Sequence, residues 1–236
     1  WLLMVRSSSA LLSPVLGVLA DRYGRRNVMI FALVSQVFGM LGIAFFKGWW
    51  VALPIFLSGL AVNAYLPAQQ AYISDLVPFE RRGRALASVD AAFAVSGIFV
   101  MPLIGWLLKI SGWRVPFIGL SALGAVTAFL SWRFLPEVHQ AAVHTHSPFA
   151  GVRRLLVQRN IQASLVVAAL LFTGVGIFMT FWSIWLSADF AFDSVDLGLM
   201  ATRIGIAEMF GVILAGLVVD KLGKQRSSLL GVVMSA

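Results

Sequence analysis

Long apolar stretches alternate with short polar segments along the whole chain. Seven stretches are each about 20 residues long, the length that a helix needs to cross the hydrocarbon core of a bilayer. They cover residues 1–20, 28–46, 49–73, 85–108, 115–135, 161–186 and 197–219. An eighth begins at Ser227 and continues to Ala236, and Trp1 already lies inside the first. The pattern predicts an all-α integral membrane protein, truncated at both ends.

The composition excludes a water-soluble globular protein. The 236 residues are 60% hydrophobic with a mean hydropathy of +0.90, whereas a soluble domain is roughly 45–50% apolar. The formal net charge is +8, but the cations lie in short clusters between apolar stretches. We therefore expect the lipid bilayer as a partner and no nucleic acid. Because the chain has no cysteine, disulfides and thiolate metal ligands are excluded.

Positive charge is concentrated in alternate loops. Most of the 18 Lys and Arg residues follow the first, third, fifth and seventh spans. The other loops hold only Lys47, Lys109 and Arg114, and the loop 187–196 has no cation. By the positive-inside rule the basic loops face the cytoplasm. We therefore predict a multi-pass protein of the inner or plasma membrane whose first span enters from outside.

One short segment occurs twice, separated by six predicted spans. The first copy contains Gly17, Asp21, Arg22, Gly24, Arg25 and Arg26, and the second contains Gly216, Asp220, Lys221, Gly223 and Lys224. Glycine at position 24 allows a tight reversal between two helices. A carboxylate at position 21 would sit at a helix C-terminus, where the helix dipole disfavours it unless donors compensate. Arg25, Arg26 or the N-terminus of another helix could supply those donors.

The segment from Gly17 to Met29 resembles the signature loop between the second and third helices of major facilitator superfamily transporters. Residues 75–83 and 112–117 are similar to that family as well. A parallel repeat of six helices is how such carriers are built. The resemblance implies family helices 2–6 in residues 1–135, a cytoplasmic linker at 136–160, and helices 7, 8 and the start of 9 in residues 161–236.

The resemblance also implies a function, namely secondary active transport of small organic solutes by alternating access. In the family, Asp21 would latch onto the opposite half in the outward-facing state. Asp220 would do the same against the start of span 85–108. Both interactions would form a gate at the cytoplasmic side.

The span 85–108 contains Gly97, Pro102 and Gly105, a pattern similar to that of antiporters in the family. Met101 and Trp106 stand where glycines are expected. The pattern favours proton-coupled efflux, with uptake by symport as the alternative. The two glycines are equally well explained as packing residues, because small residues let membrane helices approach closely.

Ionisable side chains inside spans are candidates for a proton or substrate path, because charges in the membrane are expensive. They are Arg6, Asp90, Arg203 and Glu208. Glu208 lies roughly 18 Å from the cytoplasmic end of its span, near the midplane, where burial would favour proton exchange. Arg6 and Arg203 lie nearer the outer face, within snorkelling distance. Asp90 is placed under two turns into its helix, where the dipole stabilises a carboxylate.

Polar residues also follow one face of span 49–73. Asn63, Pro67 and Gln70 are spaced by four and three residues and share that face. We predict that this face lines water or substrate. The resemblance implies that Thr173 and Thr180 of span 161–186 border the central cavity. Trp182 and Trp185 are expected in the interfacial belt.

The linker 136–160 contains His139, His144 and His146. A loop without a nearby carboxylate or cysteine is a poor metal site, so we expect no metal and no cofactor. Ser147 followed by Pro148 is typical of a helix start and predicts a short helix along the membrane surface.

Two other classes of membrane protein remain as alternatives. A seven-helix receptor would explain Asp21-Arg22-Tyr23, but that triplet follows the first span and its repetition is left unexplained. An integral membrane enzyme would need a catalytic constellation at one depth, whereas all three histidines lie in one linker. We therefore expect a monomeric carrier whose partners are a small-molecule substrate and protons, and not an enzyme.

Overall fold

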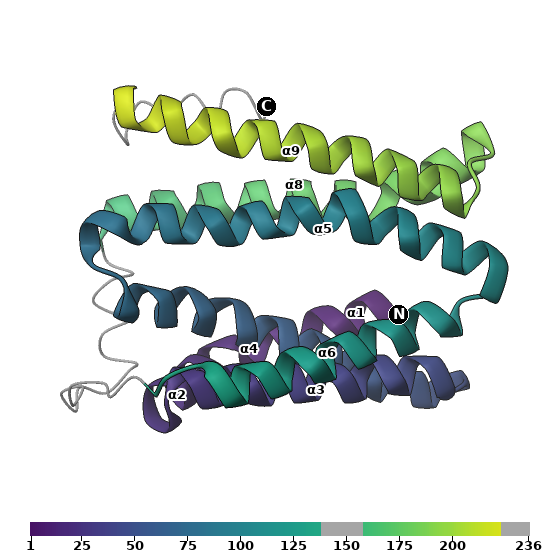
Figure 1. Cartoon of the computed structure of the whole chain (residues 1–236), viewed down its shortest axis with the longest axis horizontal. Helices are drawn as coiled ribbons and strands as arrows, with labels where there is room; N and C mark the ends of the chain where they lie inside the picture. The colour runs from purple at the N-terminus through teal and green to yellow at the C-terminus, as the bar shows by residue number, and fades with distance from the viewer. Residues whose placement is uncertain (138–157, 223–236) are drawn as a thin grey trace.

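The computed structural model describes residues 1–137 and 158–222, and every regular element in those ranges is a helix (Figure 1). Seven helical segments there are long and apolar enough to cross a membrane. The elements are α1 (Leu2–Ser8), η1 (Ser9–Leu12), α2 (Ser13–Tyr23), α3 (Arg25–Phe45), η2 (Gly48–Val51), α4 (Ala52–Leu76), η3 (Phe79–Arg81), α5 (Arg82–Ser111), α6 (Arg114–Phe134), α8 (Arg159–Phe190) and α9 (Ser194–Leu222). The predicted all-α membrane class and the seven full spans are confirmed. The apolar stretch from Ser227 lies outside the described residues.

The first span is not one continuous α-helix. A 3-10 turn, η1, separates α1 from α2. Pro14 stands in the first turn of α2, where the lack of an N–H costs nothing. For the same reason Pro14 cannot donate the hydrogen bond that would continue an α-helix from the preceding residues. The hydroxyl of Ser8 donates to the carbonyl of Val5 at 2.7 Å, and that of Ser9 to the carbonyl of Arg6 at 2.6 Å. These serine hydroxyls compete with backbone N–H groups for the carbonyls of α1, which favours a break in the α-helix here.

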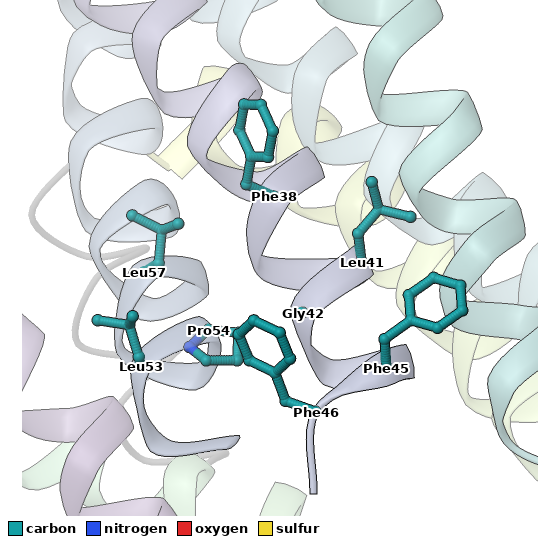
Figure 2. A pocket seen from close by; sticks show the side chains of 8 residues that line it. All are labelled: Phe38, Leu41, Gly42, Phe45, Phe46, Leu53, Pro54 and Leu57. Carbon is teal, nitrogen blue, oxygen red and sulfur yellow. The ribbon is translucent and has the colours of Figure 1, made fainter. Parts of the chain in front are cut away.

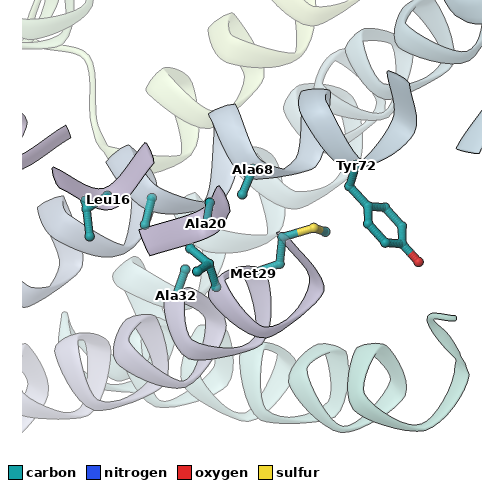
Figure 3. Packing of buried hydrophobic residues seen from close by; sticks show 8 residues of the cluster. Leu16, Ala20, Met29, Ala32, Ala68 and Tyr72 are labelled. Carbon is teal, nitrogen blue, oxygen red and sulfur yellow. The ribbon is translucent and has the colours of Figure 1, made fainter. Parts of the chain in front are cut away.

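A core of small residues joins α2, α3 and α4. Figure 3 shows Leu16 and Ala20 of α2 against Met29 and Ala32 of α3, with Ala68 of α4 alongside. Each of these side chains is at most 8% exposed. Alanine lets helix backbones approach closely, which is how helices associate in a membrane, where apolar burial alone gives little driving force. α3 also packs along α6, and α1 packs on α4.

The helix α5 leaves this group and packs mainly against α9. In Figure 1 it runs alongside α9, across from the layer that holds α3 and α6. Three glycines are buried where α5 and α9 cross, namely Gly105, Gly198 and Gly205. By contrast, most of α8 is exposed, and its single described buried residue is Leu186. The seam between α5 and α9 therefore joins the N-terminal group of helices to the C-terminal one.

The basic ends of the helices lie together. In Figure 1, α2, α4, α6 and α9 end at the left, and α3 and α5 begin there. The turn at Gly24 and the last turns of α9, which carry the two copies of the repeated segment, are thus at the same end of the bundle. The links that contain Lys47 and Asp193 lie at the opposite end. The predicted gate requires both copies of the segment at one end of the bundle.

Aromatic rings meet at that opposite end. The ring centroids of Trp1 and Trp49 are 4.9 Å apart, and those of Trp185 and Phe190 are 5.3 Å apart. Such rings concentrate where a membrane meets water. The pair at the end of α8 agrees with the belt position expected for Trp185.

Candidate functional site

The turn between α2 and α3 is built on Gly24. Its φ of +88° lies in the region that favours glycine, and the two helices end and begin on either side of it. The amide of Asn27 donates to the carbonyl of Tyr23 at 3.0 Å, which satisfies a carbonyl at the end of α2. The predicted tight reversal is present. At Gly17, in contrast, a Cβ would meet nothing within 4 Å, so packing does not require glycine there.

Two arginines fix this turn to other helices. Arg25 forms an ion pair with Asp75 at 2.5 Å and also donates to the carbonyl of Ala71, both in the last turns of α4. Arg26 pairs with Glu137 at 2.8 Å and donates to the carbonyl of Trp132 at the end of α6. Neither arginine is therefore a simple surface anchor.

A cavity of about 160 Å³ lies between α2 and α4, directly beside this turn. Its polar lining includes Asp21 and Arg25 of the repeated segment and Asn63 of α4. Pro67 also lines it, and because proline has no N–H, the carbonyl of Asn63 lacks its usual helical partner. The remaining lining residues are Ser13, Leu16, Gly17, Ala20, Ala64, Ala68 and Ala71. The polar face of α4 thus adjoins the repeated segment.

The members of the α4 face do not all reach this cavity. The amide of Asn63 donates to the buried hydroxyl of Ser9 at 3.0 Å, across the contact with η1. Gln70 is exposed and is not part of the lining. Arg22 is exposed too, with its guanidinium 5.6 Å from the ring centre of Tyr23. Roles in transport for these residues stay predictions.

A second cavity, of about 340 Å³, lies between α3 and α4 near the other end of the bundle. Figure 2 shows its walls, which are hydrocarbon throughout: Phe38, Leu41, Gly42, Phe45, Phe46, Leu53, Pro54 and Leu57. A Cβ on Gly42 would come within 2.5 Å of the Cβ of Pro54, so glycine permits the contact that closes one side. This groove can hold only an apolar group. This groove was not predicted from the sequence, although the pair of Gly42 and Pro54 was a possible signal.

The predicted antiporter-like residues of α5 all face α9. A Cβ on Gly97 would lie 3.4 Å from the Cα of Gly205, and a Cβ on Gly198 would lie 3.0 Å from the Cα of Pro102. At Gly105 a Cβ would overlap the carbonyl oxygen of Ser194. The three residues therefore act in packing at this seam. Their relation to the direction of transport stays a prediction.

The four ionisable residues predicted inside spans, Arg6, Asp90, Arg203 and Glu208, are all exposed in this structure. The burial expected for Glu208 is not found. The predicted stabilisation of Asp90 by the helix dipole is also wrong. α5 begins at Arg82, so Asp90 lies beyond the first two turns of the helix. Among the described residues, none of the four side chains has an ion-pair partner.

The packing nevertheless relates two of these carboxyls. α5 and α9 are antiparallel, and Gly205 lies against the carbonyl of Ala94. One helical turn further toward the Gly24 end, Asp90 of α5 comes level with Glu208 of α9. The tertiary structure thus brings two separately predicted residues to one depth.

The second copy of the repeated segment begins inside α9. Gly216, Asp220 and Lys221 lie in the final turns of α9. Gly223 and Lys224, the three linker histidines and the Ser147–Pro148 pair lie outside the described residues.

Comparison with known proteins assigns the chain to a family. The model of the Major Facilitator Superfamily matches residues 1–236. The chain belongs to the Major Facilitator Superfamily. Its fold agrees, since it superposes on the partially occluded inward-open conformation of the xylose transporter XylE from E. coli with a TM-score of 0.62 and 18% identity. That superposition covers 95% of this chain and 64% of XylE.

Superfamily relatives include proteins named for drug resistance. The chain is 28% identical to "Multidrug resistance protein 2" of Bacillus subtilis, over 93% of this chain and 57% of that protein. It is 27% identical to "Multi-drug resistance efflux pump PmrA" of Streptococcus pneumoniae, over 93% of this chain and 56% of that protein. The chain therefore spans a little over half the length of these curated relatives. Membership of this family favours transport over the receptor and enzyme alternatives.

The two threonines predicted on α8 of this superfamily member have different surroundings. Thr173 is exposed, whereas Thr180 is half-buried and its hydroxyl donates to the carbonyl of Gly176 at 2.7 Å. That hydroxyl can still accept a hydrogen bond from a solute. A place beside the central cavity stays a prediction for both.

Sequence reasoning assigned no site role to Asp75, Glu137, Lys109 or Asp193, although all four form ion pairs. Asp75 did occur in a segment similar to the superfamily. Its pairing with Arg25 joins residues from different helices, which no local pattern encodes.

Breaking the Arg25 pair should destabilise the turn. Both side chains are partly shielded, with exposed fractions of 21% for Arg25 and 31% for Asp75. We expect Arg25→Ala to lower the free energy of unfolding by about 1–2 kcal/mol, because it leaves a part-buried carboxylate without its charged donor. Tryptophan fluorescence during thermal unfolding in detergent measures this.

Arg22→Ala is the matched control, since it removes an exposed arginine from the same turn. Asp75→Ala and the double variant complete a double-mutant cycle. Once one partner of the pair is removed, removing the other should lower the free energy of unfolding only a little further. Equal losses in Arg22→Ala and Arg25→Ala would contradict the proposed importance of the pair.

Proposed function

We propose that this superfamily member is a secondary active transporter that exports small organic solutes by alternating access, coupled to proton entry. The observation that carries the proposal is the repeated Asp-containing segment at one end of the bundle. Within residues 1–137 and 158–222, the two helix groups meet closely only at the seam between α5 and α9. Two relatives whose names refer to multidrug resistance support organic solutes as the substrate class. Substrate binding would then be followed by rocking of one half against the other.

The halves in this proposal are residues 1–135 and 161–236, with 136–160 as the linker between them. The end that carries the repeated segment would face the cytoplasm, since most of the basic residues cluster there. The protein would act as a monomer with protons and one solute as its ligands, and it would convert no substrate chemically.

The direct test is solute movement in proteoliposomes. The protein is reconstituted, a pH gradient is imposed, and ethidium is followed by fluorescence as the first member of a panel of organic dyes. The proposal expects dye movement opposite to the proton flux, which stops when nigericin collapses the gradient. Movement with the proton flux would contradict export, and gradient-independent movement would contradict coupling.

Asp21→Asn should slow this transport without unfolding the protein. Asparagine has the size of aspartate and accepts hydrogen bonds, but it lacks the charge that the proposed gate uses at the end of α2. We expect a several-fold lower initial rate of dye movement. Asp189→Asn, an exposed carboxylate near the end of α8, serves as the control and should transport normally. An unchanged rate for Asp21→Asn would count against the gate.

A further inference from the structure

An ion pair joins the two helix groups at the end of the bundle that lacks the repeated segment. Lys109, in the last turn of α5, donates to Asp193 at 2.8 Å. Asp193 lies in the link between α8 and α9, and the two residues are 84 positions apart in sequence. No other ion pair among the described residues connects α5 or an earlier helix to α8, α9 or their link.

The carboxylate of Asp193 is held in place by the start of α9. One of its oxygens accepts the backbone N–H groups of Val195 and Asp196 at 2.8 and 2.9 Å, and the other accepts Lys109. Asp196 in turn accepts the backbone N–H of Asp193 at 3.1 Å. This reciprocal arrangement is a helix cap. The cap fixes the orientation of the carboxylate, so that the oxygen not used by the cap points toward Lys109 of α5.

The backbones of the same two elements touch directly beside the ion pair. Gly105 of α5 lies so close to the carbonyl of Ser194 that a side chain would not fit. Lys109 is one turn further along α5 from Gly105. A cation at the C-terminus of one helix and a carboxylate at the N-terminus of the other also suit both helix dipoles.

We propose that Lys109 and Asp193 form a latch that holds the two halves of the transporter together at this end, opposite the Asp21 gate. The inference rests on the proposed function, since a latch between halves has a role only if the halves move. Opening this end would separate the ammonium from the capped carboxylate. The pair would therefore favour the conformation that is closed here and open at the end with the repeated segment.

Electrostatics agree with a latch that persists at neutral pH. The hydrogen bond from Lys109, with those from the backbone of α9, lowers the pKa of Asp193 to about 2. Because the pKa of Asp193 is lowered from its ordinary value of 3.8, the ion pair with Lys109 is fully present above pH 3.8. It is lost as the pH falls through about 2. The carboxylate therefore stays ionised over the pH range in which transport is measured.

Distance measurements can test the latch without any transport assay. The chain has no cysteine, so Ser111→Cys and Ser187→Cys, both at exposed positions at this end, can carry two spin labels in the otherwise unchanged protein. Double electron–electron resonance in nanodiscs then reports the separation of α5 from α8. Lys109→Gln, Lys109→Glu and Asp193→Asn are compared on this background. Asparagine is a good helix cap, so the last variant removes the charge and keeps the start of α9.

We expect each of these variants to increase the population at longer distances, by roughly two- to fivefold for a pair as exposed as this one. Lys109→Arg, which keeps the pair, and Lys47→Gln, an exposed lysine at the same end, should match the parent distribution. A Lys109→Glu distribution that superposes on the parent would overturn the latch. Failure of gradient-driven transport in the parent protein would overturn the proposed function and would leave the distance result standing.

Discussion

Glu208→Gln is expected to abolish proton-gradient-driven transport while leaving membrane insertion intact. Glutamine keeps the shape of the side chain and removes its exchangeable proton, which proton coupling requires. Glu208 is exposed on α9 and has no ion-pair partner among the described residues, so the substitution removes no such contact. The measurement is the initial rate of dye movement in proteoliposomes under an imposed pH gradient, with insertion checked by the yield of protein extracted from membranes.

Asp90→Asn is the matched variant, because Asp90 is a second carboxyl at the level of Glu208 across the seam. We expect it to reduce the rate less, since we place the exchangeable proton on Glu208. Normal gradient-driven transport by Glu208→Gln would remove this residue from the mechanism. Loss in Asp90→Asn alone would transfer the proton role to α5.

Gly105→Ala is expected to have the largest effect on stability, lowering the free energy of unfolding by about 1–3 kcal/mol. The new methyl group would overlap the carbonyl oxygen of Ser194. A backbone atom cannot rotate away as a side chain can, so α5 and α9 must separate. Separation would also loosen the packing of Gly198 and Gly205, where a Cβ would lie only 3.0 Å from atoms of α5. Thermal unfolding followed by tryptophan fluorescence should show a midpoint several degrees lower.

Gly119→Ala in α6 is the control, because a Cβ there meets nothing within 4 Å. It should be neutral or slightly stabilising, since alanine has a higher helix propensity than glycine. Gly205→Ala should fall between the two, with its nearest contact at 3.0 Å. Equal midpoints for Gly105→Ala and Gly119→Ala would show that the seam tolerates separation.

The membrane spans could be predicted because a bilayer imposes a strong, local constraint. A helix must be apolar over its whole length to cross hydrocarbon, and that requirement is visible in any window of about 20 residues. The boundaries were less accurate. α5 begins at Arg82 before its predicted start, and the first span is interrupted by η1, because polar residues and proline act at helix ends without changing the overall hydropathy.

The candidate site was predicted only in part. The turn at Gly24 follows from a local conformational need of one residue, so the sequence was sufficient. The partners of Arg25 and Arg26 could not be predicted, because Asp75 and Glu137 approach them only after α3 packs on α4 and α6. The exposure of Glu208 was missed for a related reason. Depth along a helix follows from counting residues, whereas the direction of a side chain depends on which neighbours pack around it.

The amino-acid sequence by itself determined which stretches cross the bilayer, that the repeated segments share one end, and the family to which the chain is similar. The hydropathy of each window and the alternation of basic and non-basic loops can both be read directly along the chain. Only the tertiary structure decided that α5 packs mainly on α9, that Gly105 meets Ser194, and that Lys109 pairs with Asp193. Lipid solvates every apolar helix face almost equally, so helix pairing depends on close backbone fit and on a few polar contacts, and these exist only when distant segments meet.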